Sequence, residues 1–275
     1  MISLFDTHAH YDTPEYDTDR VEMLRFVRDA GVLHILNVSY DMGSSERSVA
    51  LSEEYPFLCA AVGVHPQYIR GLDKEASHVT AKMRLQELVR HPAVVAVGEC
   101  GLDYYEMKSG KKEDAKKRSQ ADITAECEQQ KAAFRWQMEL AAQTGLPVVV
   151  HSRASGADTM QILREFPAVH GVMHGFSYSA EIALECVKLG WYIGIGPVIT
   201  RTGTRKIREV VEKLPVERLL IETDCPFQTT ESCRGRLGDS RMLTEIVSEI
   251  ALIKGLSPEE VAGVTTESSV KLFLR

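Results

Sequence analysis

The stretch Phe5-Asp6-Thr7-His8-Ala9-His10 follows directly on the first apolar run of the chain, Ile2–Phe5. In an extended chain, residues i and i+2 point to the same side, so His8 and His10 can reach one metal ion together. Two surface histidines would have the same spacing, so the pair alone leaves both interpretations open. Further ligand-type side chains follow other apolar runs in the same way: His65, Glu99, His151, His174 and Asp224.

Apolar runs of strand length alternate with amphipathic stretches of helix length along the whole chain. The runs are Ile2–Phe5, Leu33–Val38, Phe57–Val64, Val94–Val97, Pro147–Val150, Gly171–Met173, Trp191–Ile195 and Leu219–Ile221. Continuous apolarity suits the strands of a parallel sheet, which are buried on both faces. The helical patterns are Thr18–Ala30, His78–Arg90, Thr124–Gln143, Ser179–Leu189, Thr204–Lys213, Ser240–Lys254 and Pro258–Leu272. This alternation predicts an α/β protein, a single-domain (β/α)8 barrel of the TIM type over residues 1–275, with a doubly wound sheet as the alternative.

Length and composition agree with one barrel and narrow the class of protein. A chain of 275 residues has the usual size of such a barrel. Its net charge of −7 argues against a protein that coats nucleic acid through its overall field, although a local basic patch stays possible. We find no basic-then-apolar leader and no apolar run of about twenty residues, so we expect a cytoplasmic protein without membrane contact. The six cysteines show no C-x-x-C pairing, so we expect free thiols.

The ligand-type residues all fall at the ends of predicted strands. In a parallel barrel the carboxyl ends of the strands meet at one mouth, so we expect these side chains to lie close together there. His34, His78, His91 and His170 fall elsewhere, and we expect them to be structural. Imidazole and carboxylate ligands suit zinc, manganese or magnesium, and their number exceeds what one ion needs. Two divalent ions about 3.5–4 Å apart are therefore the simplest interpretation.

Three residues have expected roles of their own. Glu99 is the best candidate for a carboxylate that bridges two ions, the alternative being an ion pair inside the barrel. Asp224 can ligate an ion and accept the proton of an attacking water; a helix N-cap is its alternative, because Cys225-Pro226 follows. Arg153 stands two residues after His151 and can pair with an anionic oxygen of the substrate. Arg70, Arg201, Arg205, Arg234 and Arg236 can do the same if their loops turn inward.

The segment Glu106–Asp122 is the most polar of the chain and predicts a loop insertion after the fourth strand. It contains Lys108, Lys111, Lys112, Lys116, Lys117 and Arg118. Such a loop is either a solvated surface segment or a basic flap over the site, since loops that follow strands lie on the catalytic face of a barrel.

Six blocks of the sequence, in order, resemble the TatD family of metal-dependent deoxyribonucleases, within the amidohydrolase-type metal barrels. The blocks are Phe5–His10, Gly63–Pro66, Gly98–Tyr105, Pro147–Arg153, His174–Ser177 and Glu222–Pro226. The resemblance implies one ion held by His8, His10 and Asp224, a second held by His151 and His174, and Glu99 between them. It also implies hydrolysis of phosphodiester bonds in DNA, with His65 and Arg153 near the substrate phosphate.

The sequence departs from the family pattern around the expected substrate rather than at the metal ligands. Ala154 stands where an acidic residue is usual, Arg234–Ser240 differs from the usual segment after the last strand, and Ser268 replaces an Asn. The intact ligand set therefore predicts metal-dependent hydrolysis, and the resemblance implies a nuclease acting on single strands or ends of DNA. The alternatives are a hydrolase of small amides or esters on the same barrel, and a catalytically silent barrel that serves as a binding protein.

Overall fold

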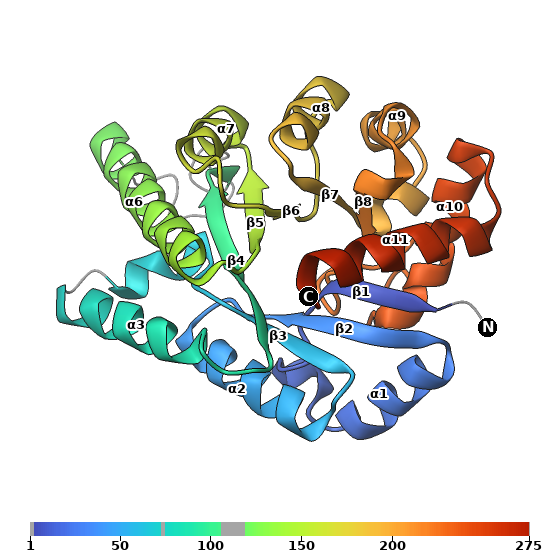
Figure 1. Cartoon of the computed structure of the whole chain (residues 1–275), viewed down its shortest axis with the longest axis horizontal. Coiled ribbons are helices and arrows are strands. Elements are labelled where there is room, and N and C mark those ends of the chain that lie inside the picture. The colour runs from blue at the N-terminus through green and yellow to red at the C-terminus, as the bar shows by residue number, and fades with distance from the viewer. Residues whose placement is uncertain (1–2, 73–74, 106–118, 275) are drawn as a thin grey trace.

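The computed structural model describes residues 3–72, 75–105 and 119–274, and its strands form a barrel (Figure 1). The strands are β1 (Leu4–Ala9), β2 (Val32–Val38), β3 (Leu58–Val62), β4 (Val94–Asp103), β5 (Val148–Arg153), β6 (Gly171–Met173), β7 (Tyr192–Ile195) and β8 (Leu219–Ile221). Each strand pairs in parallel with the next one along the chain. A parallel bridge between Ala9 and Cys225 joins β1 to the segment after β8. This consecutive order confirms the predicted (β/α)8 barrel and excludes the doubly wound alternative.

Helices surround the strands on the outside (Figure 1). They are α1 (Arg20–Asp29), α2 (Met42–Glu54), α3 (Glu75–Leu88), α6 (Gln120–Thr144), α7 (Gly156–Glu165), α8 (Ala180–Lys188), α9 (Arg205–Lys213), α10 (Leu243–Lys254) and α11 (Pro258–Phe273). Short 3-10 turns, η1 to η5, span Pro14–Tyr16, Pro66–Leu72, Pro197–Thr200, Val216–Arg218 and Ser240–Met242. The predicted helix from Ser240 therefore begins at Leu243, because the Asp239 carboxylate accepts the Arg241 N–H and caps a separate turn.

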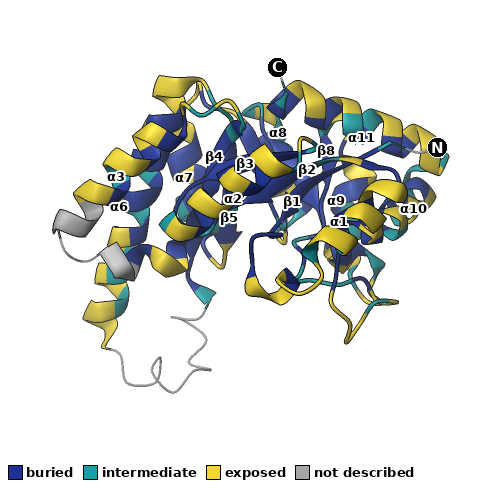
Figure 2. Cartoon of the chain, turned by 90° about the horizontal axis from the view of Figure 1, so that it is seen from below, coloured by how far each residue is buried: buried dark blue, intermediate teal, exposed yellow. Residues whose placement is uncertain are grey.

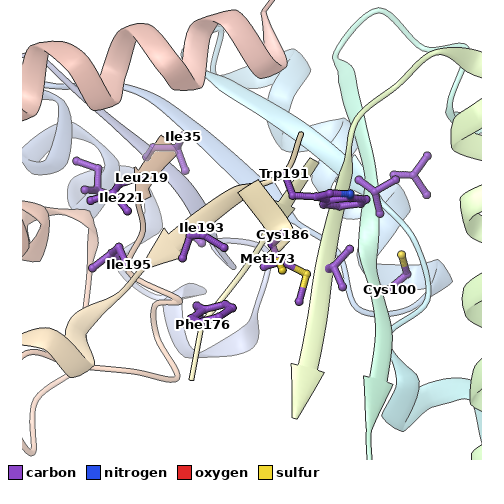
Figure 3. Close-up of a cluster of buried hydrophobic side chains, with 14 of the residues drawn as sticks. Ile35, Cys100, Met173, Phe176, Cys186, Trp191, Ile193, Ile195, Leu219 and Ile221 are labelled. Carbon is purple, nitrogen blue, oxygen red and sulfur yellow. The ribbon is translucent and has the colours of Figure 1, made fainter. Parts of the chain in front are cut away.

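The alternation of side chains along the strands separates two layers of core. Val149 of β5, Val172 of β6 and Leu220 of β8 belong to an inner cluster, in which Phe5 and Phe273 of α11 also pack, their ring centroids 6.1 Å apart. Neighbouring residues on the same strands face the helices and form the outer layer. Figure 3 shows part of that outer layer around β7 and β8, and Figure 2 shows the buried strands beneath exposed helix surfaces.

Three strands run further than their apolar runs predict. β1 continues to Ala9, β4 to Asp103 and β5 to Arg153. The β4–β5 ladder pairs Gly101 with His151 and Asp103 with Arg153, so polar residues take part in it. Several ligand-type side chains therefore belong to the rigid ends of strands rather than to the loops that follow.

The predicted insertion Glu106–Asp122 is shorter than expected at its end. Ser119 caps α6 by accepting the Asp122 N–H, and Gln120–Asp122 form the first turn of that helix. Residues 106–118, with the six basic side chains, lie outside the described residues.

Among the helices that the structure describes, we find none long and apolar enough to cross a membrane. The cytoplasmic location stays a prediction.

Candidate metal centre

The periodicity of the strands brings the ligand-type residues to one place. Val149 and Val172 face the barrel interior, so His151 and His174, two residues further along, face the same way. His8 and His10 project from the end of β1, and Asp224 follows β8, which neighbours β1 through the closing bridge. Glu99 enters from β4. The carboxyl ends of the strands thus direct both carboxylates and four imidazoles into one buried centre.

The first half of this centre lies at the junction of β1 and β8. His8 Nε2 is 3.1 Å from His10 Nε2, and His10 Nε2 is 3.2 Å from Oδ1 of Asp224. Oε2 of Glu99 lies 3.4 Å from His8 Nε2. Atoms of His8, His10 and Glu99 here lie close enough together to hold a metal ion, and a set from His8, Asp224 and His174 does so across the two halves.

The second half lies on the other side of Glu99. Its Oε1 is 2.7 Å from His151 Nδ1, 3.3 Å from His174 Nε2 and 3.7 Å from His65 Nε2. His65, Glu99 and His151 form a third set with metal-holding spacing. His65, which the resemblance places near the substrate phosphate, thus reaches the same carboxylate as the expected ligands.

The orientation of the imidazoles fits a cation between them. His10 Nδ1 lies 2.6 Å from the Val38 carbonyl oxygen, which can only accept, so Nδ1 carries the proton. The same logic applies to His174, whose Nδ1 lies 3.1 Å from Oε1 of Glu222. In the neutral rings, Nε2 then presents a lone pair to carboxylate oxygens of Asp224 or Glu99. Acceptors that face acceptors in a buried site are reconciled by a positive charge, and nitrogen and oxygen donors suit a divalent metal.

The electrostatics of the centre also call for positive charge. Burial acts to raise the pKa of Asp224, but the hydrogen bond with His10 and the charges of His174 and His8 outweigh it and hold that pKa well below its usual range. Burial acts in the same direction on Glu99, yet His174, His65 and His8 hold its pKa well below the usual value. Burial acts to lower the pKa of His174, while the negative charges of Glu222 and Glu99 raise it well above normal, so His174 takes up a second proton when no metal ion neutralises these carboxylates. Both carboxylates are therefore ionised.

Two acidic residues support the imidazoles from outside, and the sequence did not single them out. Glu222 is fully buried and its Oε1 also accepts the Gly175 N–H at 2.6 Å, while its Oε2 has no hydrogen-bond partner among the residues that the structure describes. Asp103 Oδ2 lies 3.4 Å from His151 Nε2 and accepts a hydrogen bond from Gln67. A charged residue directly after the apolar residues of a parallel strand, as in Ile221-Glu222 and Leu102-Asp103, is the signal that could have revealed both.

The N-cap alternative for Asp224 does not hold, and the ion-pair alternative for Glu99 is confined to pairs with histidines. Asp224 precedes no helix among the described elements: its backbone oxygen accepts the Gln228 N–H in a turn, and Gln228 Nε2 donates to its Oδ2 at 2.7 Å. The N-cap interpretation is therefore wrong. Glu99 contacts histidines, and no Lys or Arg among the described residues pairs with it. Asp224 has a φ of 52°, a strained value that Asp tolerates better than most residues.

The remaining candidate residues lie at the margin of the centre or away from it. Arg153 is exposed at the end of β5, with its guanidinium carbon 4.0 Å from the centroid of the Tyr105 ring. His34 packs against Phe5, and His91 pairs with Glu53 at 3.1 Å. His170 is exposed and directly precedes β6, at the end of the strand away from the centre. The side chain of His78 lies outside the described residues.

Comparison with known proteins agrees with the geometry. A family model described as "TatD related DNase" matches residues 5–274. The chain is 38% identical over 272 residues to the "uncharacterized metal-dependent hydrolase YabD" of Bacillus subtilis, covering 98% of each protein. It is 32% identical over 282 residues to "deoxyribonuclease TATDN3" of Homo sapiens, covering 99% of this chain and 95% of the human protein.

A solved structure extends the comparison to three dimensions. The crystal structure of YjjV, described as a TatD homologue from Escherichia coli, superposes with a TM-score of 0.86 at 29% identity and covers 100% of both chains. The family match, the solved structure and the buried histidine–carboxylate centre therefore point to the same family. The chain belongs to the TatD family and is a metal-dependent hydrolase.

Proposed function

We propose that this hydrolase is a deoxyribonuclease that cleaves phosphodiester bonds in single-stranded DNA or at DNA ends, with two divalent ions. The observation that carries the proposal is the position of Glu99. Its Oε2 faces His8, whereas its Oε1 faces His151 and His174. A carboxylate with ligand-type nitrogens on both sides suits two neighbouring ions better than one.

The proposed ligands divide at Glu99. His8, His10 and Asp224 would hold one ion, His151 and His174 would hold the other, and Glu99 would contribute negative charge to both. Zinc, manganese and magnesium all accept such nitrogen and oxygen donors. Ions bound there supply positive charge for the phosphoryl oxygens and lower the pKa of an attacking water.

Asp224 is the proposed proton acceptor. Its Oδ1 faces His10 and His8, and its Oδ2 is held by Gln228, so the carboxylate is fixed at the border of the centre. As the water oxygen attacks phosphorus and the phosphorus–oxygen bond to the leaving group breaks, Asp224 takes the proton of the water, and the departing oxygen takes a proton from solvent. Glu99 keeps its negative charge, and His65 and Arg153 are proposed to contact the phosphate.

Exposed aromatic rings beside the centre favour a nucleic-acid substrate over a small amide or ester. Phe227 is 60% exposed and its ring lies 5.1 Å from that of His10. Tyr68, also exposed, lies 5.1 Å from Tyr40, which in turn neighbours His10. Nucleobases of single strands stack on such rings without sequence preference. The human relative, named as a deoxyribonuclease, supports the same substrate class.

The test compares substrates directly. Purified protein loaded with zinc, manganese or magnesium is given single-stranded and blunt duplex DNA labelled at either end, and a panel of small amides and esters. We expect cleavage of DNA, fastest on the single strand, and cleavage at least about a hundredfold slower by Asp224→Asn protein. Turnover of amides or esters with intact DNA would overturn the proposal and favour the small-molecule alternative. Absence of all turnover in fully metal-loaded protein would favour the silent barrel.

A further inference from the structure

A cleft of about 360 Å³ opens beside the metal centre. It lies between the segment after β6, the segment after β7 and the beginning of α9. Its apolar wall comes from Phe176, Val198 and Ile207, and its polar side from Arg205, Lys206 and Gln228. A volume of this size lies within the range of small-molecule pockets, about 300–1,000 Å³.

The cleft is continuous with the residues that support the proposed metal ligands. Gln228 lines it and donates the 2.7 Å hydrogen bond to Oδ2 of Asp224. Gly175 lines it as well, directly follows His174 and donates its N–H to Glu222. A group bound in the cleft therefore lies next to the proposed metal ligands Asp224 and His174.

The walls suit a flat, largely apolar group. Phe176 and Ile207 are each 6% exposed and form a fixed apolar surface, whereas Val198 is 37% exposed at the margin. Phe176 packs in the outer core layer, where Figure 3 shows it near Ile193. A buried ring that belongs to the core holds its position, so this wall is preformed before any ligand arrives.

The entrance suits negative charge. Arg205 and Lys206 are exposed, and neither forms an ion pair with another of the residues that the structure describes. The lining includes no acidic side chain. Both basic residues stand in the first turn of α9, where the helix dipole adds positive potential.

We infer that this cleft is a nucleotide subsite: it binds the nucleoside on one side of the scissile phosphate, with the next phosphate of the strand against Arg205 and Lys206. The inference rests on the proposed deoxyribonuclease function. It adds the path of the bound DNA strand, which runs from this cleft across the metal centre. The aromatic rings of Phe227, Tyr40 and Tyr68 then receive the other side of the substrate.

The experiment measures kcat/KM in metal-loaded protein for two substrates. These are a single-stranded DNA tetranucleotide and methyl 4-nitrophenyl phosphate, a phosphodiester without a nucleoside. The value for the tetranucleotide divided by the value for the small phosphodiester is the ratio compared between variants. Val198→Trp fills the margin of the cleft, and we expect it to lower the ratio about tenfold, the scale of losing contacts to one base. Leu252→Trp is the matched control, because Leu252 is 73% exposed on α10, outside the cleft.

A second variant tests the charge and does not depend on how a tryptophan packs. The double variant Arg205→Ser, Lys206→Ser should raise KM for the tetranucleotide and flatten its salt dependence, because fewer counterions are released on binding. Arg25→Ser with Arg90→Ser removes two exposed charges elsewhere and should leave both unchanged. Cleavage of both substrates with an unchanged ratio and salt slope in the cleft variants overturns this inference alone. If metal-loaded wild-type protein cleaves neither the tetranucleotide nor the small phosphodiester, the proposed function is overturned, and this inference with it.

Discussion

The Nδ1 atom of His174 lies 3.1 Å from Oε1 of Glu222, and that oxygen also accepts the Gly175 N–H. Because Oε1 acts as an acceptor, Glu222 holds the proton on Nδ1 of His174 and turns Nε2 of that ring toward Glu99. Gly194 makes room for this carboxylate, since a Cβ atom there would collide with its second oxygen. Glu222 thus positions a proposed metal ligand without reaching the metal itself.

Glu222→Gln should weaken the binding of one ion by about 10–100-fold, the usual effect of removing the carboxylate behind a ligating histidine. Competition with a coloured zinc chelator measures that affinity. Glu217→Gln, at an exposed position before β8, is the control. An affinity equal to that of wild type would mean that Glu222 only fills space.

Glu99→Gln should remove both ions, because the carboxylate lies between the two groups of histidines and contributes charge to each. Elemental analysis after dialysis counts the ions per chain. His91→Gln, far from the centre and paired with Glu53, should retain the wild-type content. Loss of a single ion from the Glu99 variant would speak against a bridging carboxylate.

Asp224→Asn should lower kcat by about 10²–10⁴-fold at saturating metal, since the amide keeps the shape of the side chain but cannot take a proton. KM for single-stranded DNA should change little. Steady-state kinetics with the metal content measured in parallel separates the two effects. A variant that keeps two ions and cleaves within about threefold of wild type would rule out Asp224 as the base.

Phe227→Ala should raise KM for single-stranded DNA about tenfold, the scale of one lost base–aromatic contact, and leave kcat nearly unchanged. The ring is 60% exposed, so its removal leaves no cavity. Leu252→Ala removes an exposed apolar side chain elsewhere and serves as the control. Equal KM values for the two variants would contradict a stacking role.

Removal of the metal by a chelator should lower the melting temperature, and return of the ion should restore it. A ligand that binds only the native state at 100 times its dissociation constant adds about 2.7 kcal/mol, which corresponds to roughly 5–10 °C for a chain of this size. Differential scanning calorimetry of the same sample with and without zinc measures the shift. Glu99→Gln protein should show little of it, and an equal shift there would place the stabilising ion elsewhere.

The barrel was predictable because parallel strands buried on both faces leave long apolar runs. The patterns singled out neither α2 nor α7. The inward face of α2 includes Ser44, Ser45 and Ser48, so apolar periodicity is weak there. Ser44 and Ser48 instead bind Asp12 and Asn37 in a buried polar network.

The sequence predicted which side chains meet at the mouth, since position after a strand is enough for that. It did not predict how they are supported. Asp103 contacts His151, and Glu222 contacts His174, only if the side chains are placed to within a few tenths of an ångström. Position after a strand does not determine side-chain placement that closely. The cleft beside the centre was equally hidden, because Phe176, Val198 and Arg205 come from three segments that only the closed ring of strands brings together.

The join between β1 and the segment after β8 has a consequence for biosynthesis. Asp224 N donates to the His8 oxygen and His10 N to the Cys225 oxygen, each at 2.8 Å, while Thr7 binds the Ile221 oxygen across 214 residues of sequence. In a growing chain His8 and His10 leave the ribosome long before Asp224, because strands β2 to β8 lie between them in the sequence. Such distant contacts form late, because the whole intervening loop must first be ordered. Full coordination of the ion proposed at this junction therefore cannot precede closure of the ring, and its uptake would mark a closed barrel.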